Sequence, residues 1–203
     1  MREEYVAILW PPIHHRWQDI VKSMSMEGVE IKKVVKYLPL CKDEEGWEKF
    51  IVDCYISHEK VDNPSVNLGS KIEKIRKKYV FEHLDKCKKE IFIVIFEFSN
   101  SKKIVNLISK ELGVDWDYTK ERLEKNKTGL VERGYSHPLN LIKDIIRKRF
   151  YDDKDMPPYH KGIWAGRKRI IHAPQSYSGC SALLNFLLER PHRKFNMEKK
   201  DEC

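Results

Sequence analysis

Four short apolar runs along the chain predict β-strands. Residues 5–10 are apolar and β-prone, and two prolines end the run because proline cannot donate to a strand ladder. Residues 29–38 alternate between apolar and polar positions well enough for a strand. Residues 91–98 are apolar almost throughout, which is typical of a central strand that is buried on both faces. Residues 169–174 contain a shorter apolar run that a proline also ends.

Between these runs, apolar residues recur three or four positions apart, which predicts amphipathic helices. The helical segments expected from this spacing and from capping residues are 13–26, 44–55, 66–87, 102–112, 137–150 and 178–188. The order of elements indicates the α+β class, in a ferredoxin-like split β-α-β arrangement whose antiparallel sheet of about four strands is covered by helices. We expect residues 1–190 to form a single α+β domain. Residues 191–203 are almost wholly charged, which predicts a disordered tail.

The charge balance favours anionic partners. The formal net charge is +8, which suits nucleic acid, nucleotides or phosphorylated metabolites. Much of the excess lies between Lys71 and Lys89 and in the final third of the chain. A lysine-rich run of this kind is more often a solvated helix face than a binding surface. The charge therefore indicates a class of partner and not a particular ligand.

The apolar runs and the cysteines bear on the cellular location of the protein. The longest apolar run is far too short to cross a bilayer, and the first residues lack the layout of a signal peptide. We therefore expect a cytoplasmic protein without a membrane partner. The five cysteines are widely scattered and form no Cys-x-x-Cys pair, which argues against a disulfide framework and a structural zinc site. We expect buried or incidental thiols.

One histidine in the final third is a candidate for chemistry. His172 ends the short strand predicted at 169–174, and a histidine whose other ring nitrogen is held by a neighbour can attack a terminal phosphate. Phosphoryl transfer otherwise needs positioning and positive charge around the phosphate oxygens, and Arg147 and Arg149 offer guanidinium groups for this. Residues two positions apart on a helix point about 200° away from each other. At most one of the two arginines is therefore expected to line a pocket.

Two segments near the end of the chain match a known pattern. They are Ile146-Arg147-Lys148-Arg149-Phe150 and Arg169-Ile170-Ile171-His172-Ala173-Pro174-Gln175-Ser176, followed by Ser181-Ala182. Their sequence resembles the pattern of nucleoside diphosphate kinases, Ile-Arg-Gly-Asp-Phe, a loop, then Asn-x-x-His-Gly-Ser-Asp-Ser and a Ser-Ala pair. The β-α-β opening of the chain is similar to that family as well. The sequence departs from the family at the end of the first strand, where Trp10-Pro11 stands in place of a Lys-Pro whose lysine contacts the transferred phosphate.

The resemblance implies a nucleotide-binding phosphotransferase that acts through a phosphohistidine. It implies that His172 is the nucleophile and that Arg147, Arg149, Arg169 and Ser176 bind the substrate. It also implies that Mg²⁺ enters with a nucleoside triphosphate, and a homo-oligomer would be compatible with it. The glutamate that orients the family's histidine has no match by spacing.

Two other interpretations stay open. The net charge and the aromatic side chains Tyr159 and Trp164, in a long loop predicted over 151–166, suit a basic nucleic-acid-binding module. The Trp10 departure suits a catalytically inert scaffold of the same fold. A further histidine pair, His14-His15, has no cysteine or carboxylate at ligand spacing, so we expect it to cap a surface helix without binding a metal.

Overall fold

The computed structural model describes residues 4–10, 16–26, 28–76, 90–100, 103–104, 106–107, 110, 138–150, 171–189 and 192–197. The strands are β1 (Glu4–Leu9), β2 (Val29–Pro39), β3 (Ile91–Phe98), β4 (Ile171–His172) and β5 (His192–Met197). Among these residues the helices are α1 (Trp17–Met24), α2 (Glu44–Ile56), α3 (Glu59–Asp62), α4 (Leu68–Ile75), α8 (Pro138–Phe150) and α10 (Tyr177–Glu189). The predicted α+β class is confirmed.

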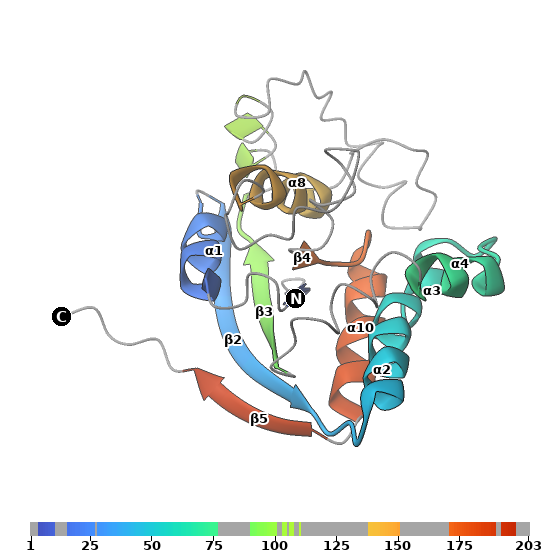
Figure 1. The fold of residues 1–203 in the computed structure, drawn as a ribbon. Helices are drawn as coiled ribbons and strands as arrows, with labels where there is room; N and C mark the ends of the chain where they lie inside the picture. Colours follow the sequence, from blue (N-terminus) through green and yellow to red (C-terminus); the bar gives the residue numbers. More distant parts are fainter. Residues whose placement is uncertain are drawn as a thin grey trace.

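The strands form one sheet in the order β4-β1-β3-β2-β5, and every neighbouring pair is antiparallel (Figure 1). Strand β3 pairs with β1 on one side and with β2 on the other, so the central position predicted for it is confirmed. Helix α1 lies between β1 and β2 in the sequence, and β3 separates these two strands in the sheet. Helix α8 lies between β3 and β4 in the sequence, and β1 separates that pair.

Helices cover both faces of the sheet. Trp17 of α1 stacks on Phe92 of β3, with ring centroids 5.1 Å apart. The side chain of the next residue along a strand points to the opposite face. On that opposite face Tyr37, the register partner of Ile91, stacks on Phe50 of α2. The segment between β2 and β3 therefore supplies a helical layer for the second face of the sheet.

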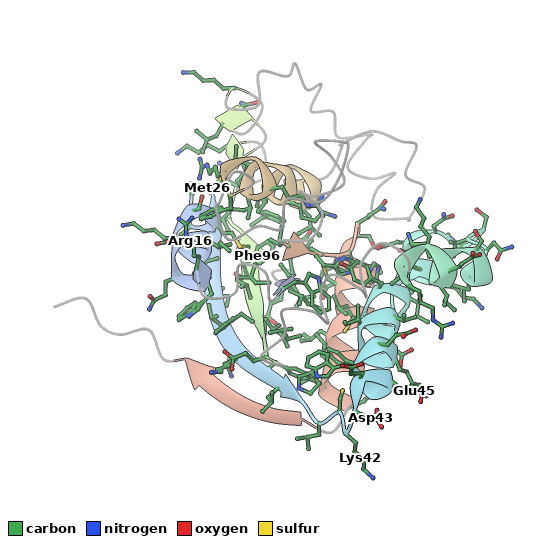
Figure 2. The ribbon with its side chains drawn as sticks, in the orientation of Figure 1. Arg16, Met26, Lys42, Asp43, Glu45 and Phe96 are labelled. Carbon is green, nitrogen blue, oxygen red and sulfur yellow. The ribbon has the colours of Figure 1, made fainter. Side chains whose placement is uncertain are left out.

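Short polar side chains and glycine set the ends of several elements. Asp43 caps α2 by accepting a hydrogen bond from the backbone of Gly46 at 2.8 Å, and it lies with Lys42 and Glu45 at the outside of the molecule (Figure 2). Asn100 accepts a hydrogen bond from the backbone of Lys103, three residues further on, at 3.0 Å, as a helix cap does. Gly28 has a φ of 92°, which suits the turn before β2 because a side chain would be strained there.

The end of the chain corrects one prediction. Residues 191–203 are expected to be disordered, but His192–Met197 form β5 and pair with β2 from Val34 to Pro39. The pairing uses main-chain groups, so a charged sequence does not prevent it, and β2 offers an edge that would otherwise stay open. Within the described part of the chain, no helix is long and apolar enough to cross a membrane.

Candidate functional site

His172 lies in the short edge strand β4, where it pairs with Ile8 of β1, and only 8 % of its surface is exposed. Its Nε2 atom is 2.9 Å from Nε2 of His58, in the turn between α2 and α3. The other ring nitrogen of His58, Nδ1, is 2.8 Å from Oδ2 of Asp62 at the end of α3. The three side chains form a buried chain of hydrogen bonds, which we call the His172 relay.

Asp62 is held by three donors. Its Oδ2 accepts from His58 and from the backbone N–H of Gln175 at 2.8 Å, and its Oδ1 accepts from the hydroxyl of Ser176 at 2.6 Å. Burial alone would raise the pKa of Asp62, but the hydrogen bonds and charge of His58, with those from Ser176 and Gln175, leave its pKa below the usual value. Asp62 is therefore an ionised carboxylate that only accepts hydrogen bonds.

The charge on Asp62 determines where the protons of the relay lie. Because Asp62 only accepts, Nδ1 of His58 must carry a proton. In a neutral His58 the Nε2 atom is then an acceptor, so Nε2 of His172 donates to it. Nδ1 of a neutral His172 is left with a lone pair, and no described residue forms a hydrogen bond with it.

Two cations of α8 lie on either side of His172. The ammonium of Lys143 donates to the carbonyl of Ala173 at 2.9 Å, and the guanidinium of Arg147 donates to the carbonyl of Ile171 at 3.0 Å. These residues are four positions apart and so lie on one face of the helix. Burial is the main cause that keeps the pKa of His172 well below its ordinary value, and the positive charges of Lys143, Arg147 and Lys71 add to it. His172 is therefore a neutral imidazole beside positive charge.

Aromatic rings pack on the other side of this histidine. The ring of Tyr55 in α2 lies 4.2 Å from the ring of His172, centroid to centroid. Tyr55 in turn stacks on the fully buried Trp10, with centroids 5.7 Å apart and an interplanar angle of 7°. Trp10 is thus part of the core, and the cations near His172 come from α8 and α4.

The structure brings together three of the five site residues expected from the sequence. Arg147 and Ser176 lie near His172, although Ser176 contacts it only through Asp62 and His58. Arg149 points elsewhere and donates to the hydroxyl of Ser23 in α1, so the expected divergence of the two arginines is confirmed. Arg169 lies outside the described residues, as do the candidates His14, His15, Tyr159 and Trp164.

Sequence reasoning missed His58 and Asp62. The signal available was their spacing of four residues, which suits a pair on one helical turn. The contact between His58 and His172 spans 114 positions, so no local pattern reveals it. It also missed Lys143, because a lysine on a helix is normally exposed and this one is buried.

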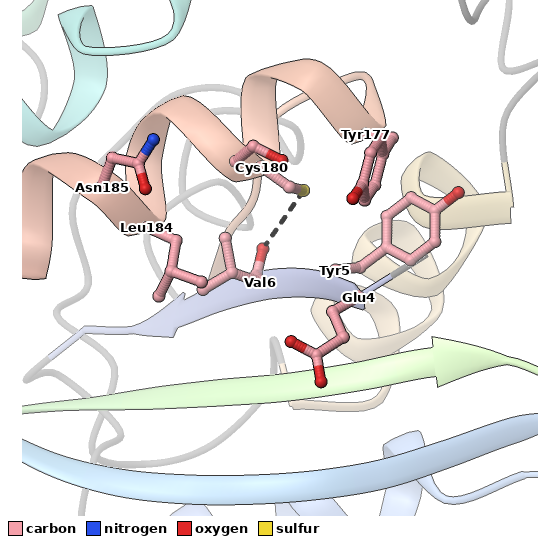
Figure 3. Close-up of a pocket in the computed structure, with 8 residues that line it drawn as sticks. Glu4, Tyr5, Val6, Tyr177, Cys180, Leu184 and Asn185 are labelled. Carbon is pink, nitrogen blue, oxygen red and sulfur yellow. Dashed lines mark hydrogen bonds between the residues drawn. The ribbon is translucent and has the colours of Figure 1, made fainter. Parts of the chain in front are cut away.

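A small hollow lies away from the His172 relay, between β1 and the first half of α10 (Figure 3). Glu4, Tyr5, Tyr177 and Leu184 are among its lining residues, and its volume is about 130 Å³. This is well below the size of a pocket for a drug-sized ligand, roughly 300 Å³ or more. Cys180 also lines it, and burial raises the pKa of that thiol to about 12, so it stays protonated.

The described residues contain no group of three or more histidine, cysteine, aspartate or glutamate side chains that is arranged to hold a metal ion. No family model, curated protein or solved structure matches this chain.

Proposed function

We propose that the chain is a nucleotide-binding phosphotransferase of the nucleoside diphosphate kinase type, in which Nδ1 of His172 attacks the terminal phosphate of a nucleoside triphosphate. The observation that carries this proposal is the state of His172. The ring is neutral, its Nε2 atom is held by His58, and two cations of α8 bind the carbonyls on either side of it. An imidazole prepared in this way is a nucleophile that needs no prior deprotonation.

The neighbouring cations suit the same chemistry. A transferred phosphoryl group carries negative charge on its equatorial oxygens, and catalysis consists largely of positioning the group and stabilising that charge. Lys143, Arg147 and Lys71 all lie close enough to His172 to lower its pKa. The same positive field would attract a polyphosphate to Nδ1. In this proposal Mg²⁺ is bound to the nucleotide and enters with it.

The arrangement of the sheet supports a ferredoxin-like core for this enzyme. The order β4-β1-β3-β2, with α1 and α8 as the two connections, has the split β-α-β layout of that fold. The layer from α2 to α4, helix α10 and strand β5 would be additions to it. Two of these additions, α3 and the start of α10, provide the residues that hold His172.

Incubation with nucleoside triphosphate labelled on its terminal phosphate, in the presence of Mg²⁺, tests the proposal. We expect an acid-labile, alkali-stable phosphate on the protein, located on His172 by peptide mapping, and absent from His172→Ala. The structure also separates the two arginines on α8. Arg147→Ala is expected to slow labelling by about 100-fold, the usual effect of removing one electrostatic contact to a developing charge, whereas Arg149→Ala retains the normal rate.

Three results would reject the proposal. Absence of label, together with no rise in thermal stability at millimolar nucleotide, would favour an inert scaffold, because bound ligand in large excess stabilises a fold by about 2.7 kcal/mol. Label that persists in His172→Ala would move the chemistry to another residue. Tight binding of RNA or DNA that weakens steeply with salt, without any label, would favour the nucleic-acid-binding alternative.

A further inference from the structure

We propose that Asp62 and His58 act as a proton relay, taking the Nε2 proton of His172 while its Nδ1 atom bonds to phosphorus. This inference rests on the proposed function and assigns roles to two residues that the sequence pattern does not identify. His58 and Asp62 act through His172 without contact with the substrate.

The geometry places each atom where a relay requires it. The distance between the two Nε2 atoms is 2.9 Å, and the distance from Nδ1 of His58 to Asp62 is 2.8 Å. Both are ordinary lengths for a hydrogen bond. The side chains of His58 and Asp62 are 4 % and 2 % exposed, so bulk water does not compete for the proton. Gln175 donates to the same oxygen of Asp62 as His58 does, and Ser176 donates to the other oxygen, so the carboxylate is fixed in place.

The proton and the electrons balance along this path. The lone pair on Nδ1 of His172 forms the bond to the terminal phosphorus, and the bond from that phosphorus to the bridging oxygen breaks. Its electron pair leaves with the nucleoside diphosphate. The ring of His172 would then carry a positive charge, which it loses when its Nε2 proton passes to Nε2 of His58. His58 becomes an imidazolium whose charge is balanced by Asp62, and transfer of the phosphoryl group to an acceptor reverses each step.

His58→Gln separates a relay from a merely structural contact. A glutamine amide carries a donor and an acceptor on one carbon, as imidazole carries Nδ1 and Nε2 on one carbon. The glutamine can therefore donate to Asp62 and accept from His172, but it cannot take up the proton. We expect this variant to bind nucleotide with an affinity within about twofold of the natural protein and to form phosphohistidine about 100-fold more slowly, the lower end of the range for assisted proton transfer.

Two further variants complete the set. Asp62→Asn removes the charge that balances a protonated His58, and we expect it to slow labelling by about tenfold or more. Ser57→Ala is the matched control, since its hydroxyl in the same turn donates to the carbonyl of Cys54 and has no contact with the relay. It should retain the rate of the natural protein.

Nitrogen NMR of the two histidines gives a readout that does not depend on activity. In the natural protein and in Ser57→Ala, we expect a proton on Nε2 of His172 and a bare Nδ1. In Asp62→Asn the amide oxygen takes the place of Oδ2, which accepts from both His58 and the backbone of Gln175, so we expect both tautomers to stay as they are. A slower rate of labelling at an unchanged tautomer is an effect that simple loss of packing would not produce.

The outcomes of this experiment separate the two proposals. If the natural protein is labelled on His172 and His58→Gln is labelled within about threefold of the same rate, the relay is wrong and the phosphotransferase stands. A proton on Nδ1 of His172 in the natural protein would also overturn the relay. Binding of a metal ion such as Co²⁺ between the two histidines would overturn the relay as well. Such binding would give the natural protein a visible spectrum that both His58→Gln and His172→Ala lose. If the natural protein takes no label, the phosphotransferase fails, and the role of the relay in phosphorylation fails with it.

Discussion

The neutral state of His172 makes the stability of the protein depend on pH in the slightly acidic range. The histidine has an ordinary pKa of about 6.5 in the unfolded chain, whereas burial, together with the charges of Lys143, Arg147 and Lys71, lowers its pKa in the fold. The unfolded state therefore binds the proton more readily than the folded state. Stability must rise with pH through this range and fall as the pH drops below the unfolded pKa.

The size of this loss of stability follows from the protons that the unfolded chain takes up as the pH falls. Between about pH 7 and about pH 5.5, the unfolded histidine becomes largely protonated while the buried ring stays neutral. One such group lowers the free energy of unfolding by about 1 kcal/mol over that interval. Asp62 does not contribute to this interval, because its pKa is lowered from 3.8 and the stability that it provides is lost only at more acidic pH.

Urea unfolding of the natural protein and of His172→Gln, at about pH 7 and about pH 5.5, measures this effect. The histidines that do not contact His172 cancel in the comparison, so the natural protein should lose about 1 kcal/mol more than the variant. The substitution His172→Gln itself lowers the free energy of unfolding at both pH values. The diagnostic quantity is therefore the change in that free energy between the two pH values, compared between the two proteins. Equal pH dependence in the two proteins would show that His172 can be protonated in the fold, which would remove the basis for a neutral nucleophile.

Three further predictions concern the fold. Tyr37→Phe removes a buried hydroxyl that donates to a carbonyl of α10 at 3.0 Å, so urea unfolding should show a loss of about 1–3 kcal/mol, and an unchanged midpoint would contradict the contact. Gly179→Ala places a Cβ atom against the carboxylate of Asp62 and should cost about 1–3 kcal/mol, whereas the control Gly69→Ala, where a Cβ meets only ordinary contacts, should cost nothing by the same assay. Removal of residues 192–203 opens the outer edge of β2. Sedimentation of the shortened protein should then show concentration-dependent association that the natural protein lacks. A monomer at all concentrations would indicate that the edge is protected in another way.

Most of the secondary structure follows from local patterns in the sequence. Strand β3 and helix α2 have strong apolar periodicity, and both lie within two residues of their predicted limits. Strand β5 could not be found in this way, because only two of its six residues are apolar and its partner is the main chain of β2. A strand that forms by closing an edge depends on where that edge lies, which only the assembled sheet determines.

The candidate site was predictable only in part. A histidine after an apolar run pointed to His172, and helical spacing showed that Arg147 and Arg149 would diverge. Which arginine meets the histidine depends on the face of α8 that packs inward, and helical spacing alone leaves that open. His58 and Asp62 come from a turn and a four-residue helix far away in the sequence. Their partnership with His172 arises from tertiary structure alone.

The pairing of β1 has a consequence for how the protein folds. The strand lies between β3 and β4, so Ile8 faces Ile93 on one side and His172 on the other. Strand β1 therefore leaves the ribosome before both of its partners and waits for them. Contacts of such large sequence separation slow folding and leave apolar segments exposed in the meantime. Assembly of the surroundings of His172 should coincide with a late step of folding, and shortened chains that lack β4 should keep one edge of β1 unpaired and depend on chaperones.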